Sequence, residues 1–395
     1  MKTIILGGGV IGLSTAYHLA KKRTGRIIVL ERGSIGSGSS GRAAGIATGL
    51  LWSETGVRAR AISLRLFREL SDELPGYTFH ATGCLNLFDA ASWPERAALL
   101  PLYDRCGAPY EVLDAPALRA RWPDLHLPDD YIGLFDPLGG YSEPDEYLPA
   151  LAQRCRELGV EICEQTMVQR LLLRGGRVAG VQTATETLEA DAVVSTLYAW
   201  TNLILESADL RLPIKAFVHQ RYVTTPLPIP LAIPAVNVNP LDGYVRPAVG
   251  GRLLLGIATP ERLEHRVTSL SFSLDELSVP ETLKERITAT FTSYLPALAA
   301  TTWAEARVGL ICFSIDGEPV LGPVARLPGL FIGAAFHSGG FAYNPVAGML
   351  LAEFVVDGQT SIDVRAFSPD RFDPTETATY LAATLAQKDV VKRRH

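Results

Sequence analysis

Three glycines and one carboxylate near the start of the chain have the spacing of a dinucleotide-binding motif. Gly7, Gly9 and Gly12 form G-x-G-x-x-G directly after the apolar residues 3–6. Glycine at these places permits a tight turn, a close approach of the main chain to a pyrophosphate and close packing of the next helix. Glu31 lies about 20 residues further on, where an acidic side chain binds a ribose hydroxyl. Because an acid there disfavours the 2′-phosphate of NADP, the motif predicts one bound NAD or FAD.

The residues around the motif predict the βαβ unit that has to position it. Residues 3–6 and 26–30 are continuous apolar runs, typical of parallel strands that are buried on both faces. The apolar residues between them recur at helical spacing, namely Leu13, Ala16, Tyr17 and Ala20. The helix would therefore begin within the motif and offer its unpaired N–H groups to the phosphates. No second motif of this kind lies between a strand and a helix, so we expect electrons from the substrate and not from a nicotinamide.

Further along, the chain predicts a mixture of strands and helices. Strands are expected at 160–163, 192–196 and 330–334, a hairpin around 175–176, sheet at 215–260, and helices at 146–158 and, for the most part, at 273–298. A last helix is expected to begin at Asn344 and Pro345, with Asn344 as N-cap and Pro345 in the first position. Residues after about 373 are expected to form a polar tail.

The composition fits a folded protein of two domains, or of one domain with a large insertion. The chain has 395 residues, 47% of them hydrophobic, and a formal net charge of −5. No basic patch suited to nucleic acid or an anionic membrane stands out, and the basic residues 392–395 are interpreted as a solvated tail. The chain has no run of about 18 apolar residues, so no membrane span is expected. Residues 1–6 are too short an apolar run for a signal peptide.

The cysteines point to a reducing compartment. There are five, an odd number, and they form neither a C-x-x-C pair nor a metal-ligand spacing. We therefore expect buried free thiols, no metal site and a cytoplasmic location.

Several further motifs follow in order along most of the chain. They are S-S-G-R-A-A-G at 39–45, Y-V-R-P at 244–247, D-G-E-P-V-L-G at 316–322, H-S-G-G-F at 337–341 and F-S-P-D-R-F at 367–372. Together with the glycine motif, they resemble the D-amino acid oxidase, glycine oxidase and sarcosine oxidase family of flavoproteins. The resemblance implies FAD and not NAD as the cofactor.

The same resemblance implies a discontinuous α/β fold. A Rossmann-type FAD-binding domain would comprise residues 1–78, 145–214 and 304–372, and an inserted α+β substrate domain with an antiparallel sheet would comprise residues 79–144 and 215–303, followed by a tail at 373–395. The residues expected to contact FAD are Gly7, Gly9, Val10, Ile11, Gly12, Glu31, Arg32, Ser39, Ser40, Arg42, Ala43, Ala44, Gly45, Val168, His337, Gly339, Gly340, Phe341 and Ala342.

The chain departs from this family where a substrate carboxylate would bind. Amino-acid oxidases of the family have an arginine in a G-L-R-P stretch, but the matching residue here is Ile311. Arginine is the natural bidentate partner of a carboxylate. Either the substrate lacks an α-carboxylate, or another group binds it, with Arg246 and Arg42 as candidates. The alternative for each of the two is that the arginine is exposed to solvent or contacts a phosphate.

Covalent attachment of FAD is not expected. Some relatives attach the flavin through a histidine just before A-A-G, where this chain has Arg42. Others use a cysteine that would align near Gly309, and Cys312 lies three places away. We expect non-covalent FAD and a packing role for Cys312. A further departure is Leu197 and Tyr198, where the family has small residues, and this pair is expected to reshape the cofactor wall.

The chemistry implied is hydride transfer from a carbon that bears nitrogen to flavin N5, which gives an imine. His337 and Tyr244 are the catalytic candidates, and Arg246, His219 and Ile311 are expected at the substrate. A neutral imidazole at His337 could accept a hydrogen bond from the amine, or the histidine could be structural. Tyr244 could equally be an aromatic core residue.

Three functions remain open at this point. The first is oxidation of a small amine or amino acid, with O2 or another carrier as the electron acceptor. The second is oxidation of a C–OH bond in a small hydroxy acid. The third is a non-catalytic flavin-binding subunit of a complex.

Overall fold

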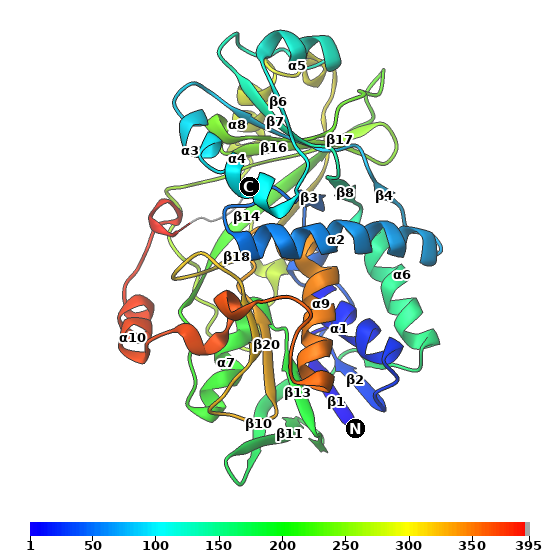
Figure 1. The fold of residues 1–395 in the computed structure, drawn as a ribbon, viewed down its shortest axis with the longest axis vertical. Helices are drawn as coiled ribbons and strands as arrows, with labels where there is room; N and C mark the ends of the chain where they lie inside the picture. Colours follow the sequence, from blue (N-terminus) through cyan, green and yellow to red (C-terminus); the bar gives the residue numbers. More distant parts are fainter. Residues whose placement is uncertain (392–395) are drawn as a thin grey trace.

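The computed structural model describes residues 1–391, so the expectation of a solvated tail at 392–395 lies outside the described residues. Two large sheets organise the chain (Figure 1). A six-stranded sheet lies in the lower half of the view and an eight-stranded sheet in the upper half. The long helix α2 (Glu54–Glu73) crosses the boundary between them.

The six-stranded sheet has the order β19-β20-β13-β1-β2-β9. Its strands are β1 (Lys2–Leu6), β2 (Arg26–Leu30), β9 (Glu161–Cys163), β13 (Ala192–Ser195), β19 (Val320–Pro323) and β20 (Leu330–Ala334). All neighbours pair in parallel except β19 and β20. The strands β2 and β20 have the bounds that the apolar runs predict, and the Rossmann-type α/β fold is confirmed.

Helices and a small sheet cover the two faces of this sheet. Ile5, Ile27 and Val29 face the cluster that includes α1 (Val10–Lys21), α6 (Pro144–Glu157) and α9 (Gly340–Asp357). The alternate residues face the predicted hairpin, which is β10 (Val168–Arg174) and β11 (Arg177–Thr183), and α7 (Thr201–Leu205). Because successive side chains point to opposite faces, continuous apolar runs are needed here.

The eight-stranded sheet has the order β18-β14-β17-β16-β15-β5-β7-β6. Its strands are β5 (Cys84–Phe88), β6 (Glu111–Leu113), β7 (Ile132–Asp136), β14 (Ile214–Thr224), β15 (Ala235–Val238), β16 (Gly243–Ala248), β17 (Arg252–Ile257) and β18 (Trp303–Ser314). The sheet is antiparallel except between β15 and β5. Because β18 pairs with β14 from Trp303 to Ser314, residues 304–314, expected in the FAD-binding domain, form part of this sheet.

The remaining elements are short and connect or cover the two sheets. They are β12 (Thr187–Glu189), the small sheet of β3 (Ile46–Ala47), β8 (Gly140–Ser142) and β4 (Phe79–His80), and the helices α3 (Trp93–Ala97), α4 (Leu100–Cys106), α5 (Ala115–Arg121), α8 (Thr282–Phe291) and α10 (Pro374–Ala382). The region 273–298, expected to be mainly helical, forms three separate helical pieces, namely η5 (Leu274–Glu276), α8 and the start of η6 (Pro296–Ala300). Prolines at 280 and 296 flank α8 and interrupt the helix.

The last helix of the FAD-binding half starts earlier than the sequence predicts. Helix α9 begins at Gly340 with Gly339 as N-cap, so Asn344 and Pro345 lie inside it. Proline has no N–H to donate to the carbonyl four residues back, which here is Phe341. The Asn344 side chain donates to that carbonyl instead, at 2.6 Å. Asn344 therefore repairs the helix and does not cap it.

The segment after residue 373 is anchored to the eight-stranded sheet. Helix α10 is capped by Asp373, and the chain then forms a β-bridge from Ala386 to Leu263. Lys215 on β14 donates both to Glu264 and to the carbonyl of Ala383. The polar tail that the sequence suggests is thus held by a buried ion pair.

Candidate active site

A cavity of about 520 Å3 lies between the two sheets and is lined from both. Gly9 and Gly333 line it from the six-stranded half, and Gly243 and Gly309 from the eight-stranded half. Cavities of this size, with mostly apolar walls and a few polar groups, are typical of small-molecule and cofactor sites.

The glycine motif forms one end of the cavity. Gly7, Gly9, Val10 and Ile11 line it, and α1 starts at Val10 without a side-chain cap. The Val10 N–H donates to Ser40 Oγ at 3.0 Å. Gly12 is not in the lining. A Cβ atom at position 12 would lie 2.0 Å from the Gly7 carbonyl oxygen, so this glycine permits the helix to pack against the turn.

The two charged residues after β2 already have partners in the protein. The Glu31 carboxylate accepts from the N–H groups of Gly8 and Gly33, both at 2.8 Å, and still lines the cavity. A carboxylate has about four lone-pair sites, so acceptor capacity remains for a ribose hydroxyl. The Arg32 guanidinium lies 4.2 Å from the Trp200 ring and donates to the Leu270 carbonyl. Burial lowers the pKa of Arg32.

The segment 39–45 forms a side wall of the cavity. Its lining residues are Ser39, Ser40, Arg42, Ala43, Ala44 and Gly45. The Arg42 guanidinium donates to the carbonyls of Ser37 and Gly38 and pairs with Asp275. Arg42 is therefore engaged with the protein, and the expectation that it could bind a substrate carboxylate has no support in this geometry.

His337 also lines the cavity and lies in a strained turn. His337 and Ala335 both have positive φ, 56° and 52°. The His337 N–H donates to the Cys312 carbonyl at 3.0 Å, and its carbonyl accepts from the Tyr198 hydroxyl at 2.6 Å. Tyr198 Oη in turn accepts from the Cys312 N–H at 2.9 Å. Tyr198, which departs from the family pattern, thus holds the turn that carries His337.

The start of α9 follows this turn. Gly340 and Phe341 line the cavity, whereas Gly339 and Ala342 do not. The N-cap residue Gly339 makes no side-chain hydrogen bond, so the first N–H groups of α9 are not satisfied by a capping side chain. Two helix N-termini therefore border one cavity, and both favour negative charge. Val168, from β10, also lines it.

Tyr244 and His219 form a pair on the side of the eight-stranded sheet. Both line the cavity, and His219 Nε2 lies 3.3 Å from Tyr244 Oη. Gly256 pairs directly opposite Tyr244 on β17. A Cβ atom at position 256 would lie 2.2 Å from Tyr244 Cζ and Oη, so the glycine gives the tyrosine ring its space.

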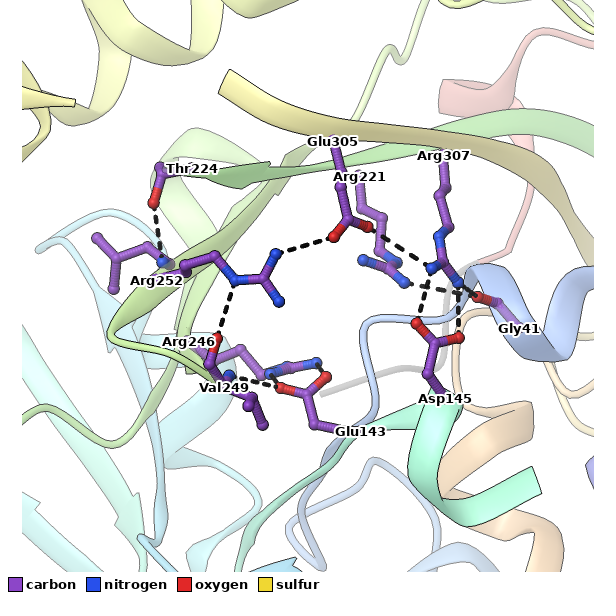
Figure 2. A network of polar contacts seen from close by, with 11 residues as sticks. Gly41, Glu143, Asp145, Arg221, Thr224, Arg246, Val249, Arg252, Glu305 and Arg307 are labelled. Carbon is purple, nitrogen blue, oxygen red and sulfur yellow. Dashed lines mark hydrogen bonds and ion pairs between the residues drawn. The ribbon is translucent and has the colours of Figure 1, made fainter. Parts of the chain in front are cut away.

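Arg246, expected at the substrate, lies outside the cavity lining. Its side chain is 0% exposed, is absent from the cavity lining and forms two hydrogen bonds with Glu143, at 2.7 and 2.8 Å (Figure 2). The pairing could not be predicted from the sequence, because Glu143 lies 103 positions away from Arg246 and leaves no local signal. Ile311 does line the cavity, and the arginines in the described lining are Arg32 and Arg42 alone, without a lysine.

Several lining residues were not predicted from the sequence. They are, on the substrate side, Trp52, Glu95, Asn237, Asn239 and Asp242. Asn239 and Asp242 belong to the turn between β15 and β16. Asp242 lies two residues before Tyr244. Polar residues in a turn beside a candidate catalytic tyrosine were the available signal, because loops at strand ends carry functional groups.

The cysteines are all free thiols within residues 1–391. Burial raises the pKa of the Cys312 thiol well above its usual value, and Cys312 packs among Trp200, Ala216 and Leu310. No group of three or more potential metal ligands occurs in the described part of the chain. No helix within the same residues is long and apolar enough to span a bilayer.

Comparison with known proteins gives a consistent result. The family model for DAO, FAD dependent oxidoreductase, matches residues 2–354. The chain is 28% identical to 4-methylaminobutanoate oxidase (formaldehyde-forming) from Paenarthrobacter nicotinovorans, over 94% of this chain and 46% of that protein. It is 26% identical to sarcosine oxidase subunit beta from Arthrobacter sp, over 94% of this chain and 90% of that protein.

Among solved structures, L-proline dehydrogenase from P. horikoshii superposes with a TM-score of 0.86 and 26% identity, covering 94% of this chain and 97% of the other. The chain thus spans less than half of the 4-methylaminobutanoate oxidase and nearly all of this dehydrogenase.

Proposed function

Because the chain belongs to the DAO family of FAD-dependent oxidoreductases, we propose that it oxidises a C–N bond of a small amine or amino acid, with FAD held in the cavity between the sheets. Bound FAD supplies a hydride acceptor at N5. The oxidised substrate is an imine, which water hydrolyses. The observation that carries the proposal is one cavity that joins the N-terminal ends of α1 and α9, both with glycine as N-cap residue, to the Tyr244 and His219 pair.

The residues around the cavity suit a dinucleotide. A Cβ atom at position 9 would lie 2.8 Å from Ser40 Oγ, so glycine is needed here for Ser40 to approach the start of α1. The same lack of a side chain is proposed to leave room for a pyrophosphate. The start of α1 is proposed to face the phosphates, and the start of α9 the flavin. Glu31 is proposed to accept from a ribose hydroxyl with its remaining lone pairs.

On the substrate side, Tyr244 and His219 are proposed to orient the amine. A neutral imidazole can accept a hydrogen bond from an amine N–H, and the tyrosine hydroxyl can fix the imidazole. His337 is proposed to shape the wall beside the flavin, since its main chain is held by Cys312 and Tyr198. Holding the reacting carbon in one orientation is the main contribution that such residues can make.

The substrate is proposed to bind without an arginine clamp on a carboxylate. Arg32 and Arg42 are engaged with protein groups, Arg246 is paired with Glu143, and Ile311 is apolar. Amines without an α-carboxylate therefore fit the cavity better than free α-amino acids do.

We propose that FAD is bound non-covalently. Cys312 is absent from the cavity lining, and its raised thiol pKa disfavours the thiolate that attachment needs. Arg42 stands where a histidine would attach the flavin. A reducing location such as the cytoplasm stays a prediction, supported by free thiols at all five cysteines.

An anaerobic titration of the purified flavoprotein tests the function. Primary, secondary and N-methyl amines, amino acids and 2-hydroxy acids are added one at a time, and the visible flavin absorbance is recorded. Bleaching of the flavin by an amine supports the proposal. Bleaching by hydroxy acids alone supports oxidation of a C–OH bond instead. A flavin that none of these reduces, in a chain that co-purifies with another subunit, supports a non-catalytic flavin subunit instead.

A further inference from the structure

Three arginines of the eight-stranded sheet donate hydrogen bonds to one short segment of main chain. Arg246 Nε lies 2.6 Å from the Ala44 carbonyl oxygen, and Arg307 Nη1 lies 2.7 Å from that of Gly41. Arg221 Nε lies 3.2 Å from the Arg42 carbonyl oxygen. Figure 2 shows Arg221 and Arg307 converging on Gly41 from neighbouring strands. The carbonyls of Gly41, Arg42 and Ala44 are thus turned toward the eight-stranded sheet.

Two of these arginines are also fixed to the start of α6. Arg246 forms a fork with Glu143, the N-cap residue, and Arg307 forms a fork with Asp145, in the first turn, at 2.8 and 2.7 Å. The fork geometry restricts each guanidinium to one orientation. The hydrogen bonds from Arg307 lower the pKa of Asp145, so this pair stays ionised at neutral pH. Each arginine therefore joins three parts of the fold.

The hydrogen bonds determine which way the peptide groups face. In a trans peptide the C=O and the next N–H point in opposite directions, and no cis peptide occurs in the described chain. With the Ala44 carbonyl turned toward Arg246, the N–H of Gly45 points away from it. Ala44 and Gly45 line the cavity and Arg246 does not, so the cavity lies on that other side. A charged donor on the carbonyl also polarises the peptide and strengthens its N–H as a donor.

We propose that Arg246 and Arg307 are positioning residues for the cofactor, although neither lines the cavity. They hold the segment 41–45 in place as a wall of the cavity, with the Gly45 N–H on the cavity side, and they tie this wall to α6 and to the eight-stranded sheet. The affinity for FAD then depends on ion pairs between Arg246 and Glu143 and between Arg307 and Asp145. The inference rests on the FAD site proposed above and adds the residues that set its geometry.

The cluster contains its own control. Arg252 pairs with Glu305 at 2.9 Å and donates to the Val249 carbonyl in its own hairpin, without touching the segment 41–45 (Figure 2). The Arg252 side chain is 30% exposed and that of Arg307 is 32% exposed. Arg252→Met and Arg307→Met therefore remove the same charge from the same cluster at similar exposure. Only the second removes the shorter hydrogen bond to the Gly41 carbonyl, which then keeps the 3.5 Å contact with Arg221 alone.

Folding risk differs between the two positioning residues. Arg246→Met leaves Glu143 with its side chain 15% exposed and without its cation, which is a strongly destabilising situation. Arg307→Met leaves Asp145 with its side chain 63% exposed, so the carboxylate remains hydrated. Arg307→Met is therefore the decisive variant, and Arg246→Met is added only if its apoprotein shows a cooperative unfolding transition.

The experiment measures FAD binding to the apoprotein of the full chain by quenching of flavin fluorescence, together with the visible circular dichroism of the bound flavin. Loss of one charge-assisted hydrogen bond predicts a dissociation constant about tenfold higher for Arg307→Met, and less than twofold higher for Arg252→Met. The dichroism is expected to change in Arg307→Met and to stay as in the wild type in Arg252→Met. Arg307→Lys, which keeps the charge, is expected to recover part of the affinity.

Equal FAD affinity in Arg307→Met and Arg252→Met overturns the inference, whatever Arg246→Met does. That result leaves the proposed function intact as long as the wild-type chain binds FAD. A wild-type apoprotein that fails to bind FAD removes the proposed function itself, so the two failures are distinguishable.

Discussion

Gly256→Ala tests whether the position of Tyr244 matters for catalysis. The added Cβ would lie 2.2 Å from Tyr244 Cζ and Oη. Because carbon atoms in contact are about 3.5 Å apart, the ring has to move by roughly 1.3 Å. Tyr244 lines the cavity, so we expect the ring to shift into that space and not to displace main chain. Overpacking costs about 1–3 kcal/mol, and we expect the lower end of that range here.

The functional effect should be larger than the effect on stability. A misplacement of about 1 Å in a positioning group can cost about 100-fold in rate, or ~2.7 kcal/mol in activation free energy. The rate of flavin reduction is measured by anaerobic stopped flow with an amine that reduces the wild type, and unfolding is followed in parallel. We expect a fall of about that size in rate with FAD still bound.

The matched control places the same substitution in a chain without the ring. In a Tyr244→Ala background the added methyl group meets no phenol, so Gly256→Ala should cause no further loss of rate. This double-mutant cycle isolates the contact between the two positions. A wild-type rate in Gly256→Ala, or an equal loss in both backgrounds, would refute the role of Tyr244.

Four further outcomes are expected. Gly12→Ala should abolish FAD binding and lower stability, since its Cβ would lie 2.0 Å from a main-chain oxygen that cannot move aside. An FAD titration and thermal unfolding measure the two effects. A stable variant that still binds FAD contradicts this prediction. Burial lowers the pKa of His18 to about 4, below an unfolded value of 6.5. Between these pH values the unfolded state therefore binds more protons than the folded state. The contribution of His18 to the free energy of unfolding is complete above pH 6.5 and falls by about 3 kcal/mol on acidification. The free energy of unfolding in urea, measured from pH 7 to 4, should change less with pH in His18→Gln than in the wild type. Equal pH dependence in the two proteins counts against a lowered pKa of His18. Lys215→Met should cost about 1.5–3 kcal/mol, because the buried Glu264 loses one of its two cations and keeps only Arg266. Proteolysis near residue 383 should become faster, and unchanged proteolysis contradicts the anchoring of α10. A thiol reagent should modify Cys106 and Cys163 in the native protein and leave Cys84, Cys155 and Cys312 unmodified, as counted by mass spectrometry.

The dinucleotide end of the fold could be predicted because its signals are local. The glycine motif, the apolar runs beside it and Glu31 all lie within one βαβ unit, and β2 has the predicted bounds. Local rules failed where a side chain replaces a main-chain group. Asn344 and Pro345 have the composition of a helix start, but the Asn344 amide supplies the donor that Pro345 lacks, so α9 begins a turn earlier.

The substrate side could not be predicted because its residues meet only through tertiary pairing. Asn237 comes to the cavity because β15 pairs with β5, whose residues lie about 150 positions earlier. Arg246 is buried by Glu143, which no spacing rule connects to it. Tyr198 departs from the family pattern, and only the structure gives its role, as the hydroxyl between Cys312 and His337.

The flavin content of the purified full chain tests the account most directly. The chain is denatured, and the released and the retained flavin are measured against protein. The account predicts one FAD per chain, all of it released on denaturation, because the N-terminal ends of α1 and α9 border one cavity and the described lining of that cavity contains no cysteine. A colourless protein whose apoprotein also takes up no added FAD would contradict the central claim.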